Sequence, residues 1–553
     1  MWFQILAIFS LLYLFRIIYG YWWRSTERKS MTVRGGRVML PMPHRLLPDW
    51  FGFISGHTLS LDKEKLTHQL EDWADRYGGD YELRICGKRA LVITDVADML
   101  KVMASRPSKF RRGLYTTHFR RVAGMIGFLP TMFFEEGKDW GRSRRIISPS
   151  LRGHNVEEMM PAMNIVAERA CSRWAASAER GEIVDVKDAT SRYAHDVICQ
   201  AGMGLQISSI DVAKGQPCPT LDGLYDLSNT FMKLILEPQA EIGWKYFPSL
   251  LEWVKKTKEN SAMLENIVHD ILKSTRAEMA SGSEGGRETD ADASGGDRVE
   301  PSRVDPGNGK ILRKIVSAGE SGSSTDRKTF SDEQIIREVK SLFFAGTDST
   351  SISLSWAIYH VTKHPEVHAR CRREALEAAP QTQGMVSTPE QLSRLVFCTA
   401  VFKEALRLNP TASSFFFHCT GDFTTKDGVE APEGTGLVLL VRYAGRSEDS
   451  FTKANEFIPE RWIEDEREEA LQGKETGDEE RKARHCPEAM FAFGSGPRVC
   501  PGQDLATTEA VLLLAAMCAR FSFVLAPGQA DPLEEVVGFT TAMRSLEVVV
   551  SRS

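Results

Sequence analysis

The sequence contains no closely paired cysteines. Its ten cysteines are scattered along 553 residues, and no two of them are separated by only two residues. This spacing excludes the usual zinc motifs and the dithiol redox motif. Unpaired cysteines are typical of a protein that works in reducing surroundings.

A strong charge imbalance is also missing. The formal net charge is -5, and 26% of the residues are charged while 42% are hydrophobic. This is the balance of an ordinary folded protein, and it offers no electrostatic basis for binding nucleic acid. No internal repeat is found either, which excludes repeat arrays.

The first residues, MWFQILAIFSLLYLFRIIYGYWW, depart from this plain composition. They are apolar except for Gln4 and Arg16, and they end in a belt of tyrosine and tryptophan. About 20 such residues suffice for a helix to cross a bilayer, and aromatic belts are common at its surface. We therefore expect a membrane anchor in residues 1–24. A cleaved signal peptide is the alternative, but no small-x-small cleavage site follows.

The rest of the chain divides by composition. Residues 25–49 are basic and contain three prolines, so we expect a stiff linker whose positive charge keeps the following body on the cytosolic side. A catalytic domain is expected over residues 50–553. Within it, residues 281–328 contain no aromatic residue and are predicted to be a disordered insertion. Residues 463–490 are predicted to be a charged, solvated excursion.

One long helix is predicted in the second half of the chain. Ser331 and Gln334 form a capping box, and no proline follows until Pro365, so roughly 30 residues can form one helix. Such a helix is expected to be buried, yet Gly346 and three polar residues stand in its middle. These residues are Asp348, Ser349 and Thr350. A cavity against the helix explains them, and the alternative is a bend with local hydroxyl bonding to the backbone.

The stretch FAFGSGPRVCPG, residues 491–502, raises a second question. It surrounds Cys500 with glycines and places Arg498 two residues before it. A loop that happens to bury a thiol does not explain this spacing.

Five motifs, taken in order, resemble the cytochromes P-450, the haem-thiolate monooxygenases. The resemblance runs from about Trp50 to the C-terminus, interrupted by the two polar stretches, and its last motif is strongly specific. The motifs are W-x-x-x-R at 140–144, A-G-x-D-S/T at 345–349, E-x-x-R at 404–407, P-E-R at 459–461 and F-x-x-G-x-R-x-C-x-G at 493–502.

The resemblance implies a mainly α fold with a small β region, with haem b held between the long central helix and the cysteine loop. The Cys500 thiolate would ligate the iron, Phe493 would shield the sulfur, and glycines at 496 and 502 would permit tight turns and a close backbone approach. Arg498, Trp140 and Arg144 would hold the propionates. The residues expected at the cofactor are Cys500, Arg498, Trp140, Arg144, Phe493, Gly494 and Gly502.

A buried structural network beneath the haem is expected from Glu404, Arg407 and Arg461, although pairs at this spacing are usually solvated.

The resemblance also implies the activity, insertion of oxygen from O2 into a C–H bond. Asp348 and Ser349 occupy the family's acid–alcohol pair, with Gly346 opening room for dioxygen. The family more often has threonine as the alcohol, so the choice between Ser349 and Thr350 stays open. Two rival functions are a peroxide-rearranging enzyme, which commonly lacks this pair, and a non-catalytic haem protein, which needs no polar notch.

Partners follow from the same resemblance. No flavin or iron–sulfur domain follows the cysteine loop, so electrons are expected from NADPH-cytochrome P-450 reductase, with cytochrome b5 as a further partner. Lys138, Arg142 and Arg145 are candidates for the docking face, although such charges are usually only solvated. The expected location is the endoplasmic reticulum membrane, with the catalytic domain in the cytosol.

Phenylalanines suggest the substrate. Phe343, Phe344 and residues 415–417, together with the segment 113–130, predict an apolar pocket for a lipophilic substrate, a fatty acid before a sterol. For the phenylalanine string the alternative is a core strand. The family often has a propionate-binding arginine near position 417, for which His418 is a candidate substitute here with its role left open, and the turn 538–543 is undecided. The arginines that could meet a carboxylate are Arg111, Arg112, Arg120 and Arg121.

Deleting residues 2–24 is expected to weaken membrane association and to leave haem binding intact, because the anchor contributes nothing to the core. Membrane flotation and the absorbance spectrum of the truncated and full-length chains measure the two effects. Loss of haem on this deletion would contradict the separation of anchor and domain.

Overall fold

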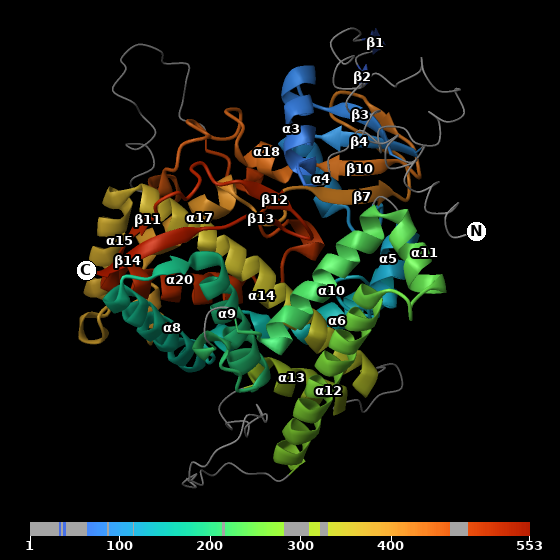
Figure 1. Cartoon of the computed structure of the whole chain (residues 1–553). Coiled ribbons are helices and arrows are strands. Elements are labelled where there is room, and N and C mark those ends of the chain that lie inside the picture. Colours follow the sequence, from blue (N-terminus) through green and yellow to red (C-terminus); the bar gives the residue numbers. More distant parts are fainter. Residues whose placement is uncertain are drawn as a thin grey trace, which may run out of the picture. The chain divides into compact units, whose positions relative to one another are not determined.

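The computed structural model is mainly helical, with small sheets, as expected (Figure 1). It describes residues 32–34, 37–39, 64–85, 88–113, 116–212, 216–280, 309–320, 330–464 and 485–553. The chain forms two compact units. The described residues of the first unit fall within 1–119, 412–454 and 484–499, and those of the second within 120–411, 455–483 and 500–553.

The first unit contains a seven-stranded sheet in the order β1-β2-β3-β4-β10-β7-β5. Neighbouring strands are antiparallel except β2 with β3 and β4 with β10. The strands are β1 Thr32–Arg34, β2 Arg37–Met39, β3 Tyr81–Ile85, β4 Lys88–Ile93, β5 Phe110–Arg112, β7 Phe415–Cys419 and β10 Gly436–Leu439. The unit also contains the hairpin β8 Phe423–Thr424 and β9 Glu430–Ala431, and the helices α3 Leu66–Tyr77, α4 Val96–Ala104 and α18 Val441–Gly445.

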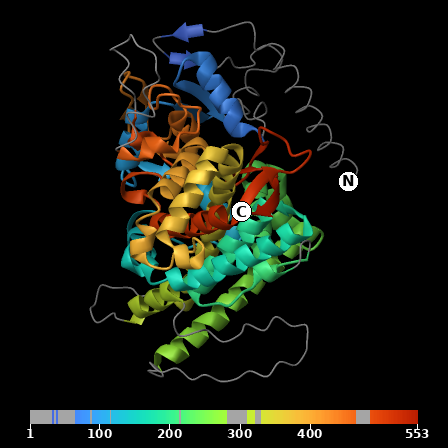
Figure 2. The same ribbon diagram turned by 90° about the vertical axis from the view of Figure 1, so that its left-hand side faces the viewer.

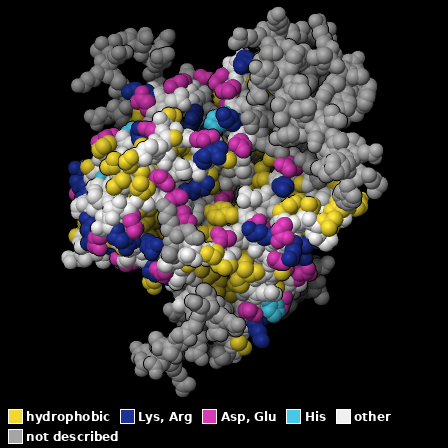
Figure 3. Space-filling view, in the orientation of Figure 1, with side chains coloured by type: hydrophobic (Ala, Val, Ile, Leu, Met, Phe, Trp, Pro, Cys, Tyr) yellow, Lys and Arg dark blue, Asp and Glu magenta, His cyan; other side chains and the backbone are white. Residues whose placement is uncertain are grey.

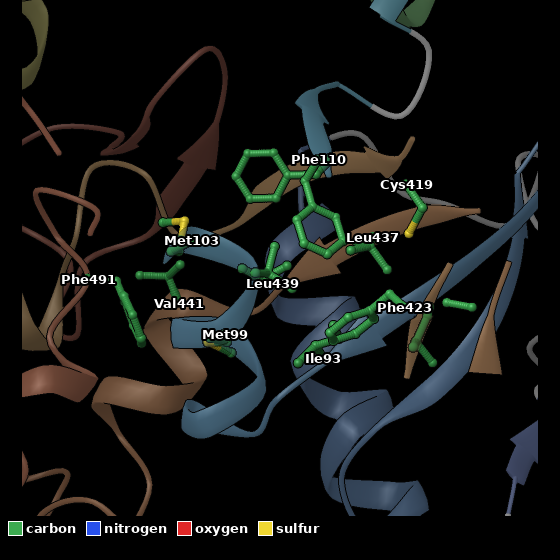
Figure 4. Packing of buried hydrophobic residues seen from close by; sticks show 14 of the residues in the cluster. Ile93, Met99, Met103, Phe110, Cys419, Phe423, Leu437, Leu439, Val441 and Phe491 are labelled. Carbon is green, nitrogen blue, oxygen red and sulfur yellow. The ribbon is translucent and has the colours of Figure 1, made fainter. Parts of the chain in front are cut away.

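Helices α3 and α4 cover opposite faces of this sheet. Leu91 and Ile93 of β4 pack with Met99 and Met103 of α4, whereas the alternate residue Val92 packs with α3. Successive side chains of a strand point to opposite faces, so a strand buried on both sides is apolar throughout. Figure 4 shows the α4 side of this core.

The phenylalanine string lies in β7 and belongs to this core. Phe417 is buried in the cluster on the α4 side, Phe415 packs against the same cluster, and Phe416 packs on the α3 side. The core-strand interpretation is therefore confirmed for Phe417, while Phe415 and Phe416 are only partly buried. Strands β1 and β2 fall in residues that the composition assigns to the linker, and they form a short antiparallel pair.

The second unit is built of helices around α14. Ser331 caps this helix with its side-chain oxygen, as predicted, and the helix spans 32 residues without a break, Asp332–Lys363. It packs against α9, α12, α17 and α20, which accounts for its burial (Figures 1 and 2). Helix α5 Thr116–Met125 begins in the first unit and continues into the second. The other helices of the second unit are α6 Gly137–Ile147, α7 His154–Glu157, α8 Met160–Arg180, α9 Val186–Val197, α10 Pro219–Leu236, α11 Pro238–Tyr246, α12 Glu252–Ala280, α13 Lys310–Glu320, α15 Pro365–Ala378, α16 Pro389–Leu392, α17 Val396–Leu408 and α20 Gln503–Arg520.

Two small sheets complete the second unit. The strands β11 Phe521–Leu525, β14 Glu547–Arg552 and β6 Ile183–Asp185 pair in that order. The strands β12 Glu535–Val537 and β13 Thr541–Met543 form a hairpin. Of the stretch 538–543 that the sequence leaves undecided, residues 538–540 form the turn of this hairpin, and residues 541–543 are strand β13.

Helix α13 corrects the prediction of disorder over residues 281–328. Ile311, Leu312, Ile315 and Val316 lie on one face of this helix and are fully or almost fully buried. The glycine- and serine-rich composition of the surrounding residues hides this short amphipathic segment. In Figure 2, α12 and α13 lie side by side at the bottom of the view.

Other domain predictions fall on residues outside the described ones. These are the anchor 1–24, most of the linker 25–49, residues 281–308 and 321–328, and residues 465–484. Among the residues that the structure describes, no helix is both long and apolar enough to span a bilayer.

Candidate functional site

The residues expected at the cofactor are divided between the two units. The division falls between Val499 and Cys500, inside the most specific motif. Phe493, Gly494 and Arg498 therefore belong to the first unit, and Cys500, Gly502, Trp140 and Arg144 to the second.

The Cys500 thiol is partly buried and has three favourable neighbours in the second unit. The backbone N–H of Gly502 donates a hydrogen bond to it, and the guanidinium groups of Arg144 and Arg152 lie close. Burial raises the pKa of the thiol, while the hydrogen bond and the two positive charges oppose that rise. A sulfur with such neighbours suits the thiolate ligand of a haem iron.

Arg144 has no ion-pair partner among the carboxylates of the described residues. Burial and the charge of Arg152 lower the pKa of Arg144, and only the Cys500 thiol opposes this shift. None of the described carboxylates lies within ion-pair distance of the Arg144 guanidinium. Trp140 stands one turn earlier on the same helix, α6, and both side chains are half-buried. A desolvated guanidinium without an anion suits a carboxylate of a bound group such as a haem propionate.

The motif residues of the first unit form a tight turn. Gly496 has a φ of 68°, and a Cβ on it would lie 2.5 Å from the carbonyl oxygen of Met103. Only glycine fits here, and the contact that it permits is with α4. Gly494 also has a positive φ, 71°, and Arg498 is buried. Figure 4 shows Phe491 and Met103 of this region packed together.

Gly502 does not adopt the glycine-specific turn conformation that was expected of it. Its φ is −91°, a conformation open to other residues, and no atom lies within 4 Å of a Cβ built there. Its observed contribution is the N–H directed at Cys500 rather than a special turn.

The middle of α14 carries the predicted notch. The turns on either side are buried, but Ala345 is exposed, and Gly346 and Ser349 are half-buried. Ala345 and Ser349 share one face because they are four residues apart. The Ser349 hydroxyl donates to the Ala345 carbonyl over 2.7 Å, so the local backbone bonding occurs as well as the opening.

Asp348, three residues after the exposed Ala345, is buried and hydrogen-bonded. The hydroxyl of Thr540 donates to its carboxylate over 2.6 Å, and Thr540 lies in the turn between β12 and β13. Burial raises the pKa of Asp348, while the hydrogen bond from Thr540 and the charge of Lys187 act against that rise. The turn between β12 and β13 is thus hydrogen-bonded to α14 through the carboxylate of Asp348.

Thr350 is also engaged elsewhere. It is buried, and its hydroxyl bonds the carboxyl group of Glu509 on α20. Burial raises the pKa of Glu509 to about 8, so this carboxyl is largely protonated at neutral pH. Neither Glu509 nor Thr540 is foreseen from the sequence, because a single glutamate or threonine in an apolar stretch carries no spacing signal.

Gly346, predicted to open room for dioxygen, lies close to a neighbouring side chain. A Cβ on this glycine would lie 3.1 to 3.3 Å from three carbons of the Ile198 side chain. Ile198 begins the π-helical turn Ile198–Gly202 that follows α9. The glycine therefore admits a close contact with that turn, and the open face lies at Ala345.

An aromatic cluster surrounds Phe344 on α14. The ring of Phe344 lies 5.0 Å from Phe539, and Phe539 contacts Phe133 at 5.8 Å and Phe231 at 5.5 Å. Phe128 lies 6.1 Å from Phe344, directly after the residues 124–127 that border an open groove with α11 and α12. Phe344 thus fits the predicted apolar wall. Phe343, by contrast, is buried against His195 and does not line it.

The predicted carboxylate-binding arginines have other partners. Arg120 bonds both oxygens of Glu135 at 3.0 and 3.1 Å, and Arg121 pairs with Glu241 of α11 at 2.8 Å. Arg111 and Arg112 lie in β5 of the first unit, where Arg111 stands opposite His418 of β7. None of these contacts was visible in the sequence.

Of the predicted docking charges, Lys138 and Arg145 are exposed on α6. Arg142 is half-buried, because it donates to Gln334 over 3.0 Å and stacks on the ring of Phe330. On the face shown in Figure 3, acidic and basic side chains are interspersed.

Glu404, Arg407 and Arg461 form the predicted network. All three are buried, so the alternative of a solvated pair does not apply. One oxygen of Glu404 accepts from both arginines and from the N–H of Ile458, and the other accepts from Arg407 and from the indole N–H of Trp462. Burial by itself would raise the pKa of Glu404, but Arg407 and Arg461 reverse the effect and hold it below its usual value.

Comparison with known proteins agrees with this geometry. A family model described as Cytochrome P450 matches residues 47–548. The chain is 25% identical over 491 residues to Cytochrome P450 3A29 of Sus scrofa, covering 88% of this chain and 86% of that protein. It is also similar to Cytochrome P450 4d2 of Drosophila melanogaster, 22% identical over 89% of this chain and 90% of that protein. It is 25% identical to Cytochrome P450 monooxygenase claW of Ampulloclitocybe clavipes, over 90% and 88% of the two chains.

Replacing the buried network acid, Glu404→Gln, is expected to lower the free energy of unfolding by about 3–5 kcal/mol, because two buried guanidinium groups lose their counter-charge. The matched control is Glu460→Gln. Glu460 precedes Arg461 and pairs with Arg370 at 3.3 Å, with both side chains 29% exposed. Its loss should cost less than about 1 kcal/mol. Equal urea midpoints for the two variants would contradict the prediction that the buried network contributes more to the free energy of unfolding than the pair of Glu460 with Arg370.

Reduced protein with carbon monoxide is expected to show the absorbance band of thiolate-ligated haem. Cys500→His should abolish this band, because Cys500 is the cysteine of the haem-loop motif. Cys486→His, at a second partly buried cysteine, should retain it. A band that survives Cys500→His would show that the ligand assignment is wrong.

Proposed function

The chain belongs to the cytochrome P450 family, and from this premise we propose that it inserts one oxygen atom of O2 into a fatty acid, with electrons from a membrane-bound NADPH reductase. Members of this family are oxidoreductases that bind haem through a cysteine thiolate. The observation that carries the proposal is the open turn of α14, where Ala345 and Ser349 face out of a buried helix beside an aromatic wall.

Cys500 is the residue that would hold the iron. When bound, the haem supplies an oxidant able to attack an unactivated C–H bond. The N–H of Gly502 and the charges of Arg144 and Arg152 would stabilise the thiolate form of the sulfur. Arg144 would also meet a propionate, since it has no described carboxylate of its own.

We assign the alcohol of the acid–alcohol pair to Ser349. Its hydroxyl lies on the exposed face of α14, whereas the Thr350 hydroxyl is held by Glu509. A serine bonded to a helix carbonyl can turn to another acceptor at little cost, because it has no second branch on Cβ. Asp348, whose pKa is raised by burial, would exchange protons through Thr540 in the turn between β12 and β13.

The aromatic wall supports a lipophilic substrate. Phe344 and Phe539 are half-buried. A substrate that covers their exposed apolar surface would gain about 25 cal/mol of binding free energy per Å². The carboxylate of a fatty acid would compete for Arg121, whose side chain is 57% exposed and whose pairing with Glu241 is exposed to solvent. A sterol offers no such anion, which is the basis for preferring the acid.

We propose the endoplasmic reticulum membrane as the location, with residues 1–24 as the single anchor and the catalytic domain in the cytosol. Exposed apolar side chains at α11 and just after it support contact with the lipid surface. They are Ile242, Tyr246 and Leu250, 46%, 62% and 69% exposed. The exposed cations Lys138 and Arg145 of α6 would attract the reductase to this helix. Cytochrome b5 is a second candidate partner for the same face of α6.

Binding of a long-chain fatty acid is expected to shift the haem Soret band more strongly, and at lower concentration, than its methyl ester or a sterol, because only the acid carries a carboxylate. The titration of all three, followed by turnover with NADPH and reductase, tests the proposal. Arg121→Gln should weaken acid binding about tenfold and leave the ester unchanged. A sterol that binds more tightly than the acid, or an ester equal to it, would overturn the carboxylate part.

A further inference from the structure

A buried acid of α14 holds the segment that joins α5 to α6. Glu338 is 1% exposed, and both oxygens of its carboxylate accept the backbone N–H of Met132, at 2.8 and 2.9 Å. The next residue back on α14, Arg337, donates to the carbonyl oxygen of Leu129 in the same segment. Two successive residues of α14 therefore bind this segment through its backbone.

The segment carries two rings of the aromatic wall. Phe133 follows Met132 directly, and its ring lies 5.8 Å from Phe539. Phe134 comes next, and its ring lies 5.7 Å from Phe231. Because both rings are attached to the backbone just after the anchored N–H, the position of Met132 decides where they stand.

We propose that Glu338 is a positioning residue, which holds Phe133 and Phe134 in place in the aromatic wall and thereby sets how well the alkyl part of a bound substrate fits against that wall. Glu338 itself touches no substrate in this role. The inference rests on the proposed function, because it names what shapes the wall of the same site.

The choice of an acid at this position calls for such a role. Burial raises the pKa of Glu338 to about 7, and the charge of Glu135 adds to the rise, while the N–H of Met132, the hydroxyl of Ser143 and the charge of Arg142 oppose it. An apolar side chain of similar volume would avoid the cost of burying a carboxyl group. It would, however, leave the N–H of Met132 without its acceptor and the segment without its anchor.

Asp196 of α9 provides a matched control. It is 0% exposed, and its carboxylate accepts the backbone N–H of Ser209 at 3.0 Å and that of Ile210 at 3.3 Å. These residues lie in the short 3-10 turn Ser209–Asp211, which contains no aromatic residue. Asp196 therefore makes the same kind of contact as Glu338, but it holds a turn that supplies no ring to the wall.

The anchor is tested first by hydrogen–deuterium exchange of the full-length, haem-loaded protein. In Glu338→Ala, the peptide that covers residues 129–135 should exchange about tenfold faster, because the N–H of Met132 loses its acceptor. Asp196→Ala should leave this peptide unchanged and speed exchange around Ser209 instead. Unchanged exchange of residues 129–135 in Glu338→Ala would overturn the anchor.

The wall is tested by titrating the Soret band with imidazole, N-butylimidazole and N-decylimidazole, whose rings bind the haem iron whatever the natural substrate is. In the wild type the affinity should rise with chain length, because the chain covers apolar surface of the wall. Glu338→Ala should reduce this gain by about tenfold and leave the affinity for imidazole itself unchanged. Asp196→Ala should keep the wild-type gain. Equal gains in the wild type and Glu338→Ala would show that Glu338 does not position the wall.

A second variant keeps the test decisive if the alanine variant fails to fold. Glu338→Gln retains one oxygen that can accept from Met132, so the gain with chain length should fall by only about threefold. If Glu338→Ala binds no haem, Glu338→Gln is compared with Asp196→Asn, and equal gains in these two variants overturn the proposal.

Failure of the proposed function is recognised separately. A wild type that gains no affinity with chain length would remove both the apolar wall and the role of Glu338. A sterol preferred over the fatty acid would overturn the substrate alone, because the imidazole series does not depend on a carboxylate.

Discussion

The carboxylate of Glu404 is the constraint on which the second unit most depends. It is fully buried, and its two oxygens accept hydrogen bonds from two guanidinium groups, a backbone N–H and an indole. An uncompensated charge in such a place would cost several kcal/mol, so every donor must be in position. The donors come from α17 itself and from residues 458–462, and the network therefore fixes that later segment against a helix which precedes it by some fifty residues in the chain.

Helix α14 shows how a functional opening is kept in an otherwise buried element. Its polar residues do not share one environment: Asp348 is held by Thr540, Thr350 by Glu509, and Ser349 alone stands on the open face. Asp348 and Thr350 thus each have a partner on a neighbouring element. The helix stays regular through the notch because these partners, and not a break in the backbone, accommodate the side chains.

Much of this could be predicted from the sequence where a local rule applies. The cap at Ser331, the length of α14 and the pairing of Glu404 with Arg407 follow from spacing along one helix. The positive φ of Gly496 follows from its motif, but its close contact with Met103 could not be predicted. Thr540 and Glu509 could not be found, because each meets α14 through a fold that brings distant residues together. The ion pairs of Arg120 and Arg121 were missed for the same reason, and α13 was missed because its four apolar residues are diluted by their surroundings.

The sheet of the first unit has a consequence for the order of assembly. Strand β4 ends at Ile93, but its parallel neighbour β10 begins only at Gly436, and the register pairs Ala90 with Gly436. During synthesis, β3 and β4 therefore emerge more than three hundred residues before the strand that completes them. Until then β4 presents an unpaired edge, which is a known route to aggregation. The nascent chain has to keep this edge protected, or fold its helical unit first, before the sheet can close.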